Sequence, residues 1–371
     1  MGYDSHRVMV GGWELGAIFG THLRLREILA HCSPSAQASG ALELNAALAD
    51  RRLDGKRSER VERLGEQHGG KGSRCDFLSI HAYNRSELAA AKFIRAKSMA
   101  LETDAEYFRD LWIVSHECCP SWRPPQDQAA AERYLGNGYY VSWCLDLAQR
   151  MLLQAAKDGR YGFGEYALTI WPPPVGFAGV NTLYRRMPVD EDGDHKPDRY
   201  IPVPDQVFWA LTLLSDFGPD YFVLPQRQFG GHVVGAFASR NREGTIRVAV
   251  YSHHGLDIQS RSRHRFSVRL ALSGLRPGQG YELVEYPFDR DHHTYVVEAI
   301  EAGLEPVIKP PVLPRALVER AVQNSRLRPA RSSTATVSHE GTLVLRTELP
   351  TNALSFLVLR PRTTEALPGG R

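Results

Sequence analysis

The sequence is poor in cysteine and has no large excess of charge of either sign. Five cysteines in 371 residues, without regular spacing, argue against a disulfide-stapled scaffold. The net charge of +3 and the lack of a basic–aromatic motif give no sign of a nucleic-acid partner. No apolar run approaches the roughly 20 residues that span a bilayer, so we expect no membrane partner. Residues 1–7 are polar and do not form a secretory signal.

Strand and helix patterns alternate over the first 218 residues. Short apolar runs predict buried parallel strands, and apolar residues at helical spacing predict the helices between them. The predicted strands are residues 7–10, 76–80, 111–115 and 166–170, and the predicted helices are residues 19–30, 86–101, 128–156 and 206–216. Ser86 is expected to cap the second helix and Gly218 to end the last one. We interpret residues 32–73 as an inserted, loosely ordered segment. The alternation of strands and helices indicates a parallel sheet with crossover helices.

Beyond Gly218 the pattern changes to short, alternating or β-branched runs separated by turns. These runs are residues 233–238, 246–251, 265–272, 281–286, 341–349 and 353–359. Such spacing is typical of an antiparallel β-sandwich. A helix near residues 315–324 belongs to a long excursion between two of these strands. The sequence therefore predicts two domains, residues 1–218 and residues 219–371.

Polar side chains follow two of the predicted parallel strands at the point where each strand ends. The strand of residues 111–115 leads into His116 and Glu117, and the strand of residues 76–80 leads into His81, Ala82 and Tyr83. At the carboxyl ends of the strands of a (β/α)₈ barrel, such groups lie on the catalytic face. Two successive strands that end in this way indicate one shared site, in which Glu117 is the central candidate.

The order of these features resembles the second half of a glycoside hydrolase family 39 enzyme, the group of β-xylosidases and α-L-iduronidases. Residues Asp76–Tyr83 are similar to the sixth barrel strand of that family. Glu117 stands where the seventh strand ends in the nucleophilic glutamate. Val10–Trp13 is similar to the turn after the family's fifth strand, and Trp171 to the tryptophan that ends its eighth strand. Residues Tyr281–Tyr286 and Leu349–Leu359 are similar to two strands of its sandwich. The resemblance implies four parallel strands of a TIM barrel followed by a β-sandwich.

The same resemblance implies retaining hydrolysis of a β-xyloside or a related glycoside, with a carbohydrate substrate. Glu117 would be the nucleophile, and His81 and Tyr83 would hydrogen-bond the sugar and keep the carboxylate ionised. Trp171 would be a sugar-stacking platform, and Trp13 and Trp122 are weaker candidates for that role. Each of these residues also has a purely structural interpretation. Glu117 could be a strand-end carboxylate paired with an arginine, and Trp171 could be a core residue. His81 and Tyr83 could be residues of the barrel mouth whose hydrogen bonds are made within the protein.

One half of the family's catalytic pair has no counterpart in this sequence. Retaining glycosidases use two carboxyl groups about 5 Å apart, and the family's acid/base is a glutamate preceded by asparagine. These 371 residues contain no Asn-Glu pair, and Glu14 is the carboxylate at a neighbouring predicted strand end. We therefore expect an N-terminally truncated form that lacks the acid/base and self-associates through an exposed barrel edge. The alternative is a non-catalytic remnant that binds carbohydrate or a partner.

Two further sets of residues, one of aspartates and one of histidines, are of types that commonly bind metal ions. Asp190, Asp192 and Asp194 have neither the glycine position nor the closing glutamate of an EF-hand, so we expect a solvated acidic loop. The pairs His253-His254 and His292-His293 are adjacent in sequence, and adjacent strand residues point to opposite faces. We expect no metal site and no cofactor, and the sequence contains no phosphate-cradling loop.

Overall fold

The computed structural model describes residues 77–80, 82–115, 118–120, 136–158, 160–163, 184–218, 220–258, 260–295 and 312–362. The chain divides into two compact units, Met1–Tyr83 with Leu88–Cys118 and Met151–Ala167, and Asn84–Glu87 with Cys119–Arg150 and Leu168–Arg371. The predicted elements at residues 7–10, 19–30, 32–73 and 166–170 lie outside the described residues. None of the helices in the described part of the chain is both long and apolar enough to cross a membrane.

A parallel three-stranded sheet lies in the first unit. Its strands are β1 (Phe77–Ser79), β3 (Trp112–Ser115) and β5 (Arg160–Phe163), in that order across the sheet. Helix α5 (Ser86–Thr103) joins β1 to β3, and α7 (Tyr139–Asp158) precedes β5. The predicted strands at 76–80 and 111–115 and the helix at 86–101 are confirmed. Strand β5 was not predicted, because its four residues begin with arginine and include glycine.

A buried lysine fixes the turn that leads into β3. Lys97 of α5 is fully buried, and its Nζ donates to the carbonyl oxygens of Phe108 at 3.0 Å, Arg109 at 2.9 Å and Leu111 at 2.7 Å. An ammonium group has three donors, and all three are used here. Because Leu111 directly precedes β3, Lys97 sets where that strand starts.

Helix α7 begins later than the predicted start at residue 128. Gly136 and Gly138 adopt φ angles of 59° and 82°, in the left-handed region that does not continue an α-helix. The Asn137 side chain accepts the N–H of Tyr139 at 3.1 Å and so starts the helix there. A Cβ atom at Gly138 would lie 1.9 Å from the Asn352 carbonyl oxygen, so only glycine fits.

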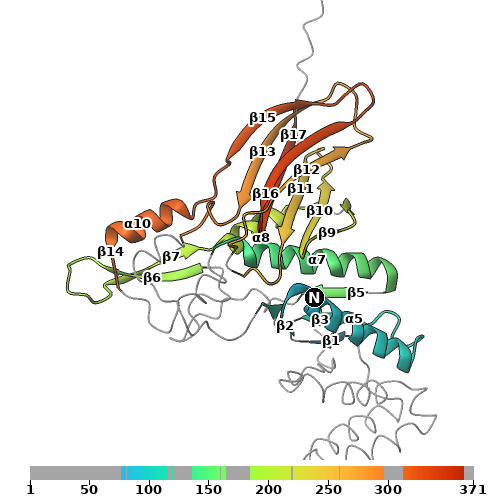
Figure 1. The fold of residues 1–371 in the computed structure, drawn as a ribbon, viewed down its shortest axis with the longest axis horizontal. Helices are drawn as coiled ribbons and strands as arrows, with labels where there is room; N and C mark the ends of the chain where they lie inside the picture. Colours follow the sequence, from blue (N-terminus) through green and yellow to red (C-terminus); the bar gives the residue numbers. More distant parts are fainter. Residues whose placement is uncertain are drawn as a thin grey trace, which may run out of the picture. The chain divides into compact units, whose positions relative to one another are not determined.

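The C-terminal part of the chain is dominated by antiparallel sheets (Figure 1). The larger sheet has the order β15-β13-β17-β11-β10-β8, with β9 paired to β10, and β12 and β16 form a separate pair. The bounds are β8 (Asp220–Val223), β9 (Arg227–Phe229), β10 (His232–Arg240), β11 (Ile246–His253), β12 (Arg265–Leu272), β13 (Gly280–Phe288), β15 (Arg331–Thr336), β16 (Leu343–Pro350) and β17 (Ala353–Pro361). All six predicted strands are confirmed, whereas β8, β9 and β15 were not predicted.

One apolar core is shared by the β12–β16 pair and one face of the larger sheet. Strand β16 alternates buried and exposed residues, and its Leu345 and Leu349 pack with Val250 of β11 and Leu357 of β17. The opposite face of β11 carries Tyr251 and other side chains that contact α7. The fold is therefore α/β plus antiparallel sheet, while the half-barrel, the sandwich and the boundary at residue 218 stay predictions.

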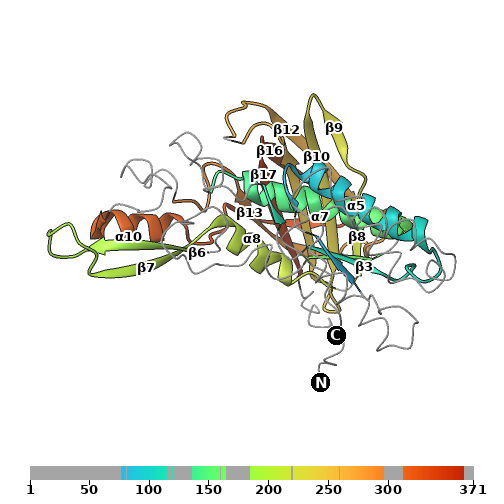
Figure 2. The same cartoon turned by 90° about the horizontal axis from the view of Figure 1, so that it is seen from below.

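A small layer was not predicted from the sequence apart from its helix. Strands β6 (Tyr184–Asp190) and β7 (Arg199–Pro204) form a hairpin, β14 (Leu313–Pro314) pairs with β6 in parallel, and α10 (Arg315–Asn324) lies beside them (Figure 2). The expected helix near residues 315–324 is confirmed. The prolines of both hairpin strands obscured them, because proline is normally depleted in strands.

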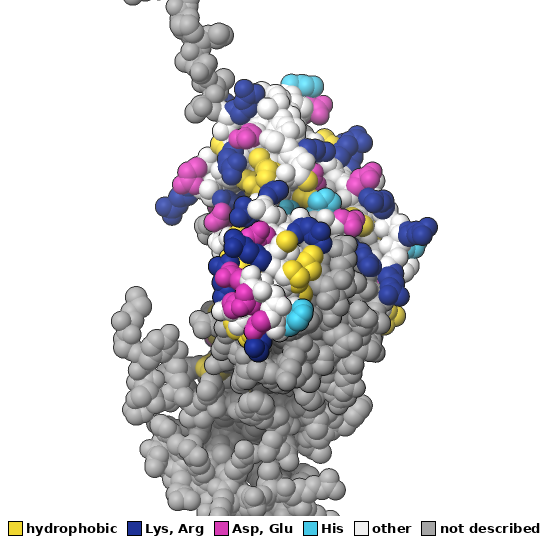
Figure 3. All heavy atoms as spheres, turned by 90° about the vertical axis from the view of Figure 1, so that its left-hand side faces the viewer, with side chains coloured by type: hydrophobic (Ala, Val, Ile, Leu, Met, Phe, Trp, Pro, Cys, Tyr) yellow, Lys and Arg dark blue, Asp and Glu magenta, His cyan; other side chains and the backbone are white. Residues whose placement is uncertain are grey.

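Helix α8 (Gln206–Ser215) matches its prediction, but the prediction for Gly218 is wrong. Asp205 caps the helix by accepting the N–H of Val207, and the C-cap is Asp216 in a right-handed conformation. Gly218 is required for another reason: a Cβ atom there would lie 2.6 Å from the Arg240 carbonyl oxygen. The surface carries interspersed charges of both signs on the face drawn in Figure 3, in keeping with the balanced composition.

Candidate active site

The parallel sheet brings the carboxyl ends of its three strands to one edge. Ser79 of β1 lies opposite Val114 of β3, and the N–H of Ile80 extends this ladder by donating to the Val114 carbonyl oxygen at 2.8 Å. On the other side of β3, Ser115 lies opposite Phe163 of β5. In sheets of this kind, ligands bind beyond the carboxyl ends of the strands.

In the sequence, three of the four predicted site residues follow the ends of β1 and β3, and Trp171 follows the predicted strand of residues 166–170. His81, Glu117 and Trp171 lie outside the described residues, as does the Tyr83 side chain. Strand β2 (Ala82–Tyr83) pairs with β4 (Cys118–Cys119). In the sequence, therefore, His81 stands between β1 and β2, Glu117 stands between β3 and β4, and each flanking strand pairs with its counterpart. The convergence of the four side chains stays a prediction, and Glu14, Trp13 and Trp122 also lie outside the described residues.

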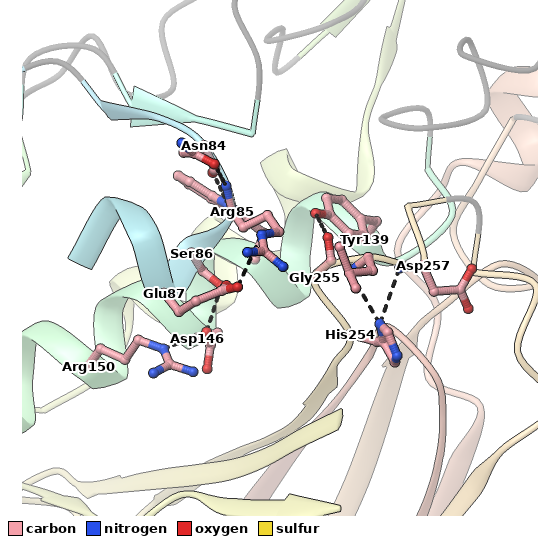
Figure 4. Close-up of polar contacts among 12 residues, drawn as sticks. Asn84, Arg85, Ser86, Glu87, Tyr139, Asp146, Arg150, His254, Gly255 and Asp257 are labelled. Carbon is pink, nitrogen blue, oxygen red and sulfur yellow. Dashed lines mark hydrogen bonds and ion pairs between the residues drawn. The ribbon is translucent and has the colours of Figure 1, made fainter. Parts of the chain in front are cut away.

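The segment directly after β2 is held by a buried polar stripe on α7. The stripe consists of Tyr139, Ser142, Trp143, Asp146, Gln149 and Arg150, which recur at helical spacing (Figure 4 labels Tyr139, Asp146 and Arg150). Five of the six are buried and Arg150 is partly buried. Each makes hydrogen bonds to other parts of the chain or within the stripe, so this face of α7 is buried by polar contacts.

Asp146 is the centre of this stripe. Its side chain is fully buried, and Oδ2 accepts from the Ser86 hydroxyl at 2.6 Å and from Nε of Arg150 at 2.7 Å. The other oxygen, Oδ1, accepts from Nε2 of Gln226 at 2.6 Å and from the Tyr251 hydroxyl at 3.3 Å. Four donors compensate the desolvation of the carboxylate, which otherwise costs several kcal/mol. Burial and the nearby Asp146 carboxylate raise the pKa of Tyr251, so its phenol remains a donor.

Two hydrogen bonds connect α7 with the residues that follow Tyr83. The indole N–H of Trp143 donates to the Asn84 carbonyl oxygen at 2.9 Å. Ser86, which we expected to cap α5, instead lies within the first turn and donates its hydroxyl to Asp146. The Asn84 side chain accepts the N–H of Arg85 at 2.9 Å and tightens the same turn.

The loop after β11 contacts this segment from the other side. Tyr139 donates its hydroxyl to the Gly255 carbonyl oxygen at 3.0 Å. Arg85 and Glu87 form an ion pair, with Nε 3.2 Å from Oε1. A Cβ atom at Gly255 would lie 3.3 Å from Oε2 of Glu87 and 3.4 Å from Cδ of Arg85, so the loop backbone approaches this ion pair closely. Figure 4 shows these residues around the start of α5. The loop after β11 therefore packs against residues Arg85 and Glu87 and against α7.

His253, at the end of β11, packs into the same stripe. Its Nδ1 lies 2.9 Å from the Ser142 hydroxyl, and its Nε2 has no hydrogen-bond partner among the described residues. Complete burial, which outweighs the nearby Asp146 carboxylate, lowers the pKa of His253 to about 4. The imidazole is therefore neutral at neutral pH.

Each histidine of the two pairs has its own partners. Nδ1 of His254 accepts the N–H groups of Leu256 and Asp257, both at 3.2 Å, while its neighbour His253 faces Ser142. His292 lies 2.8 Å from the Asp289 carboxylate, and this hydrogen bond raises the pKa of His292. His293 contacts the carbonyl oxygens of Pro287 and Arg328, both at 2.7 Å. Adjacent histidines therefore point to different partners, as their sequence positions indicated.

In the acidic group at the β6–β7 turn, Asp192 and Asp194 are exposed and Asp190 is partly buried. Asp190, Asp192 and Asp194 offer carboxylate oxygens within 4.8 Å of one another. The Asp190 carboxylate accepts the N–H groups of Gly193 at 2.6 Å and His195 at 3.0 Å. These are contacts that an acidic turn makes by itself, and the expectation of no metal site stays a prediction.

The polar stripe of α7 was missed by the sequence reading. That reading assigned an apolar stripe to this helix, and its Tyr140, Val141 and Leu145 are indeed buried. On an amphipathic helix the polar residues of the remaining face ordinarily lie in solvent. The repeat of polar residues at helical spacing from Tyr139 to Arg150 could have revealed this stripe, although such a repeat more often marks an exposed helix face.

No protein-family model and no curated protein sequence matches this chain. Solved structures do match, among them a bacterial orthologue of human α-L-iduronidase, with a TM-score of 0.56 and 17% identity over 79% of this chain and 50% of its own. A monomeric β-xylosidase from Caulobacter crescentus CB15 gives 0.52 and 15%, covering 82% of this chain and 58% of its own. A family 39 glycoside hydrolase from Xanthomonas axonopodis pv. citri gives 0.51 and 13%, covering 77% and 55%.

These likenesses confirm the predicted resemblance to family 39 at the level of the fold. They cover about four-fifths of this chain, and the chain spans about half to three-fifths of the length of those structures. At 13–17% identity they carry information on fold alone.

Proposed function

We propose that this chain carries the nucleophile half of a retaining glycosidase site, with Glu117 as the nucleophile and a β-xyloside or related glycoside as the substrate. The pairing of β1 with β3 and of β2 with β4, on either side of His81 and Glu117, is the observation that supports this most strongly. The fold likeness to a β-xylosidase and an iduronidase orthologue supports it independently.

We further propose the domain arrangement that the sequence suggested. Residues 1–218 would form four parallel strands of a barrel, and residues 219–371 a β-sandwich. The parallel order β1-β3-β5 and the antiparallel ladders after residue 220 support this division.

In the proposed reaction, an oxygen of Glu117 attacks the anomeric carbon of the bound sugar. A bond forms between that oxygen and the anomeric carbon, and the bond to the leaving oxygen breaks with its electron pair going to the leaving group. His81 and Tyr83 would hydrogen-bond the sugar and hold the carboxylate ionised, and Trp171 would stack against the sugar ring. Water then hydrolyses the glycosyl ester and restores the configuration at the anomeric carbon.

Protonation of the leaving oxygen has no evident supplier in this sequence, which contains no Asn-Glu pair. General acid catalysis contributes about 10²–10⁴-fold. We therefore expect very slow hydrolysis of alkyl glycosides and measurable hydrolysis of dinitrophenyl glycosides, whose leaving group needs little protonation.

The test is steady-state hydrolysis of dinitrophenyl β-xyloside and methyl β-xyloside by the purified chain and by Glu117→Gln. We expect slow turnover of the activated substrate only, abolished by Glu117→Gln. Unchanged turnover in Glu117→Gln would exclude Glu117 as the nucleophile. Ordinary enzymatic rates on methyl xyloside would show that an acid/base is present, and Glu14 would be the first residue to mutate. Binding of xylan without any turnover would support the non-catalytic alternative.

A further inference from the structure

The two strands of the β12–β16 pair are buried unequally on the face that they turn to the larger sheet. Leu345 and Leu349 of β16 are 3% and 1% exposed. Their direct partners across the ladder, Leu270 and Phe266 of β12, pack against the same core but are only partly buried. Directly opposite residues of an antiparallel pair share a face. The uncovered side of this core therefore lies at β12.

The larger sheet exposes aromatic side chains on the same side. Phe222 of β8 lies opposite Ala238, which packs against the shared core, so Phe222 points to the core face. Phe229 of β9 lies opposite His232, and both rings contact Phe266 of β12. Yet Phe222 is 67% and Phe229 51% exposed. Strands β9, β10 and β12 lie together in both ribbon views (Figure 1, Figure 2), but β12 does not cover this margin of the larger sheet.

The outer edge of β12 can accept a further strand. Among the described residues, β12 pairs with β16 alone. In an antiparallel ladder every second residue directs its N–H and C=O away from the partner strand. The eight residues of β12 thus offer a row of donors and acceptors. A strand added there would extend the pair over Phe222 and Phe229, which is the geometry of peptide recognition by strand addition.

The solvent-facing side of the β12–β16 pair is basic. Arg265 and Arg269 of β12 are exposed, and Arg269 lies directly opposite Arg346 of β16. In the part of the chain that the structure describes, none of these three arginines forms an ion pair. Glu348 is also on this side but lies opposite Ser267. Because like charges across a ladder are destabilising, an acidic neighbour would relieve an existing repulsion.

The same charges distinguish a second copy of this chain from a different partner. Antiparallel pairing of β12 with β12 of another copy would bring Arg265 and Arg269 of both chains to one face of one ladder. Their mutual repulsion opposes such a dimer. A strand with acidic residues on that face would be attracted instead.

We propose that the open side of β12 is a docking site for an extended segment of another polypeptide in which apolar and acidic residues alternate. The main chain of the segment pairs with the free edge of β12. Its apolar side chains cover Phe222, Phe229 and Phe266, and its carboxylates lie beside Arg265 and Arg269. This role does not depend on the proposed glycosidase activity.

The test measures binding of short synthetic peptides, matched in length to β12, to the full chain by fluorescence anisotropy. A peptide of alternating glutamate and valine should bind, and a peptide of alternating lysine and valine should bind about 10-fold more weakly or less. The glutamate–valine peptide with an N-methylated backbone keeps its side chains but lacks N–H donors. It should not bind, because strand addition needs those donors.

Three substitutions separate the contribution of charge from that of apolar contact. Arg269→Glu should weaken binding of the glutamate–valine peptide about 10-fold and strengthen binding of the lysine–valine peptide. Phe222→Ser should weaken both about 10-fold, since it removes apolar surface without a change of charge. Arg326→Glu, a charge reversal at an exposed position after α10, is the matched control and should change neither. All three positions are exposed, and thermal unfolding checks that each variant is folded.

Hydrogen exchange locates the bound peptide. The amides of β12 should exchange more slowly in the complex, whereas those of β15, at the far edge of the larger sheet, should not change. Protection of β15 in place of β12, equal binding of the two peptides, binding of the N-methylated peptide, or no binding of the glutamate–valine peptide at about 1 mM would each overturn the proposal. A dimer in sedimentation that Phe222→Ser abolishes would identify a second copy as the occupant and would also overturn it.

Discussion

Two buried regions of the second unit are stabilised in opposite ways. Between β12–β16 and the larger sheet, the core is made of aliphatic side chains such as Leu345 and Leu357, which alternate with exposed residues. Along α7, one buried face is a row of polar side chains that form hydrogen bonds with segments up to 116 residues away in sequence, as Tyr139 does with Gly255. The first kind of core tolerates approximate shapes, whereas the second requires every donor to meet its acceptor.

The two regions differ in how closely their contacts fix the atoms that they join. An aliphatic core holds two sheets together without fixing their atoms closely, since the hydrophobic effect is non-directional. The polar stripe of α7 joins the antiparallel sheet to the residues that follow β2. Its directional contacts fix the backbone from Asn84 to Ser86, which a non-directional apolar contact would not do.

The largest difference should appear when each region receives a substitution of similar size. Asp146→Leu leaves Ser86, Gln226 and Arg150 without their acceptor, and we expect a loss of about 3–5 kcal/mol in the free energy of unfolding. Leu357→Met, a size-conserving change in the aliphatic core, should cost less than about 1.5 kcal/mol. Urea denaturation of both variants measures these values. Equal losses would mean that the polar stripe has no special role in stability.

A second test uses pH. His253 has a pKa of about 4 in the folded chain, lowered by its burial, against an ordinary value of 6.5 when unfolded. Between these values unfolding takes up a proton, so the stability that His253 contributes is complete above pH 6.5 and is lost as the pH falls toward 4. The difference corresponds to about 3 kcal/mol.

The measurement is the urea midpoint of the wild type and of His253→Gln at pH 7.5, 6 and 5. The wild type should lose stability steadily over this window and the variant should lose less, because His253 no longer titrates. His232 and His293, whose pKa values burial also lowers, remain in both chains. Parallel curves for the two proteins would show that His253 is protonated, or exposed, in the folded state.

The smallest effect concerns the solvent-facing side of the β12–β16 pair. Arg269 lies directly opposite Arg346 across this ladder, and like charges in such pairs are destabilising. Arg269→Glu should raise the free energy of unfolding by less than about 1 kcal/mol, with the gain disappearing in 1 M salt. Arg265→Glu, at a position opposite Pro350, is the control and should gain less. A gain that persists in high salt would contradict the electrostatic explanation.

Patterns with a regular period were predictable from the sequence, and contacts between distant residues were not. The alternation in Arg265–Leu272 predicted β12 with its observed bounds, and the apolar run after Asp76 predicted β1. The late start of α7 depends on backbone angles at Gly136 and Gly138, which a helical pattern does not reveal. The Ser86–Asp146 contact joins residues 60 positions apart, and only the fold brings them together. Of the candidate site, the sequence supplied the strand ends and the residues that follow them.

The most direct test of the central claim is to locate the covalent adduct. The wild-type chain is incubated with a 2-deoxy-2-fluoro dinitrophenyl xyloside, whose 2-fluoro group slows hydrolysis of the glycosyl ester so that the ester accumulates. The chain is then digested with pepsin, and the modified peptide is sequenced by mass spectrometry. We predict a single modified residue, Glu117, and no adduct in Glu117→Gln. An adduct on another carboxylate, or an unmodified chain after prolonged incubation, would contradict the assignment of Glu117 as the nucleophile.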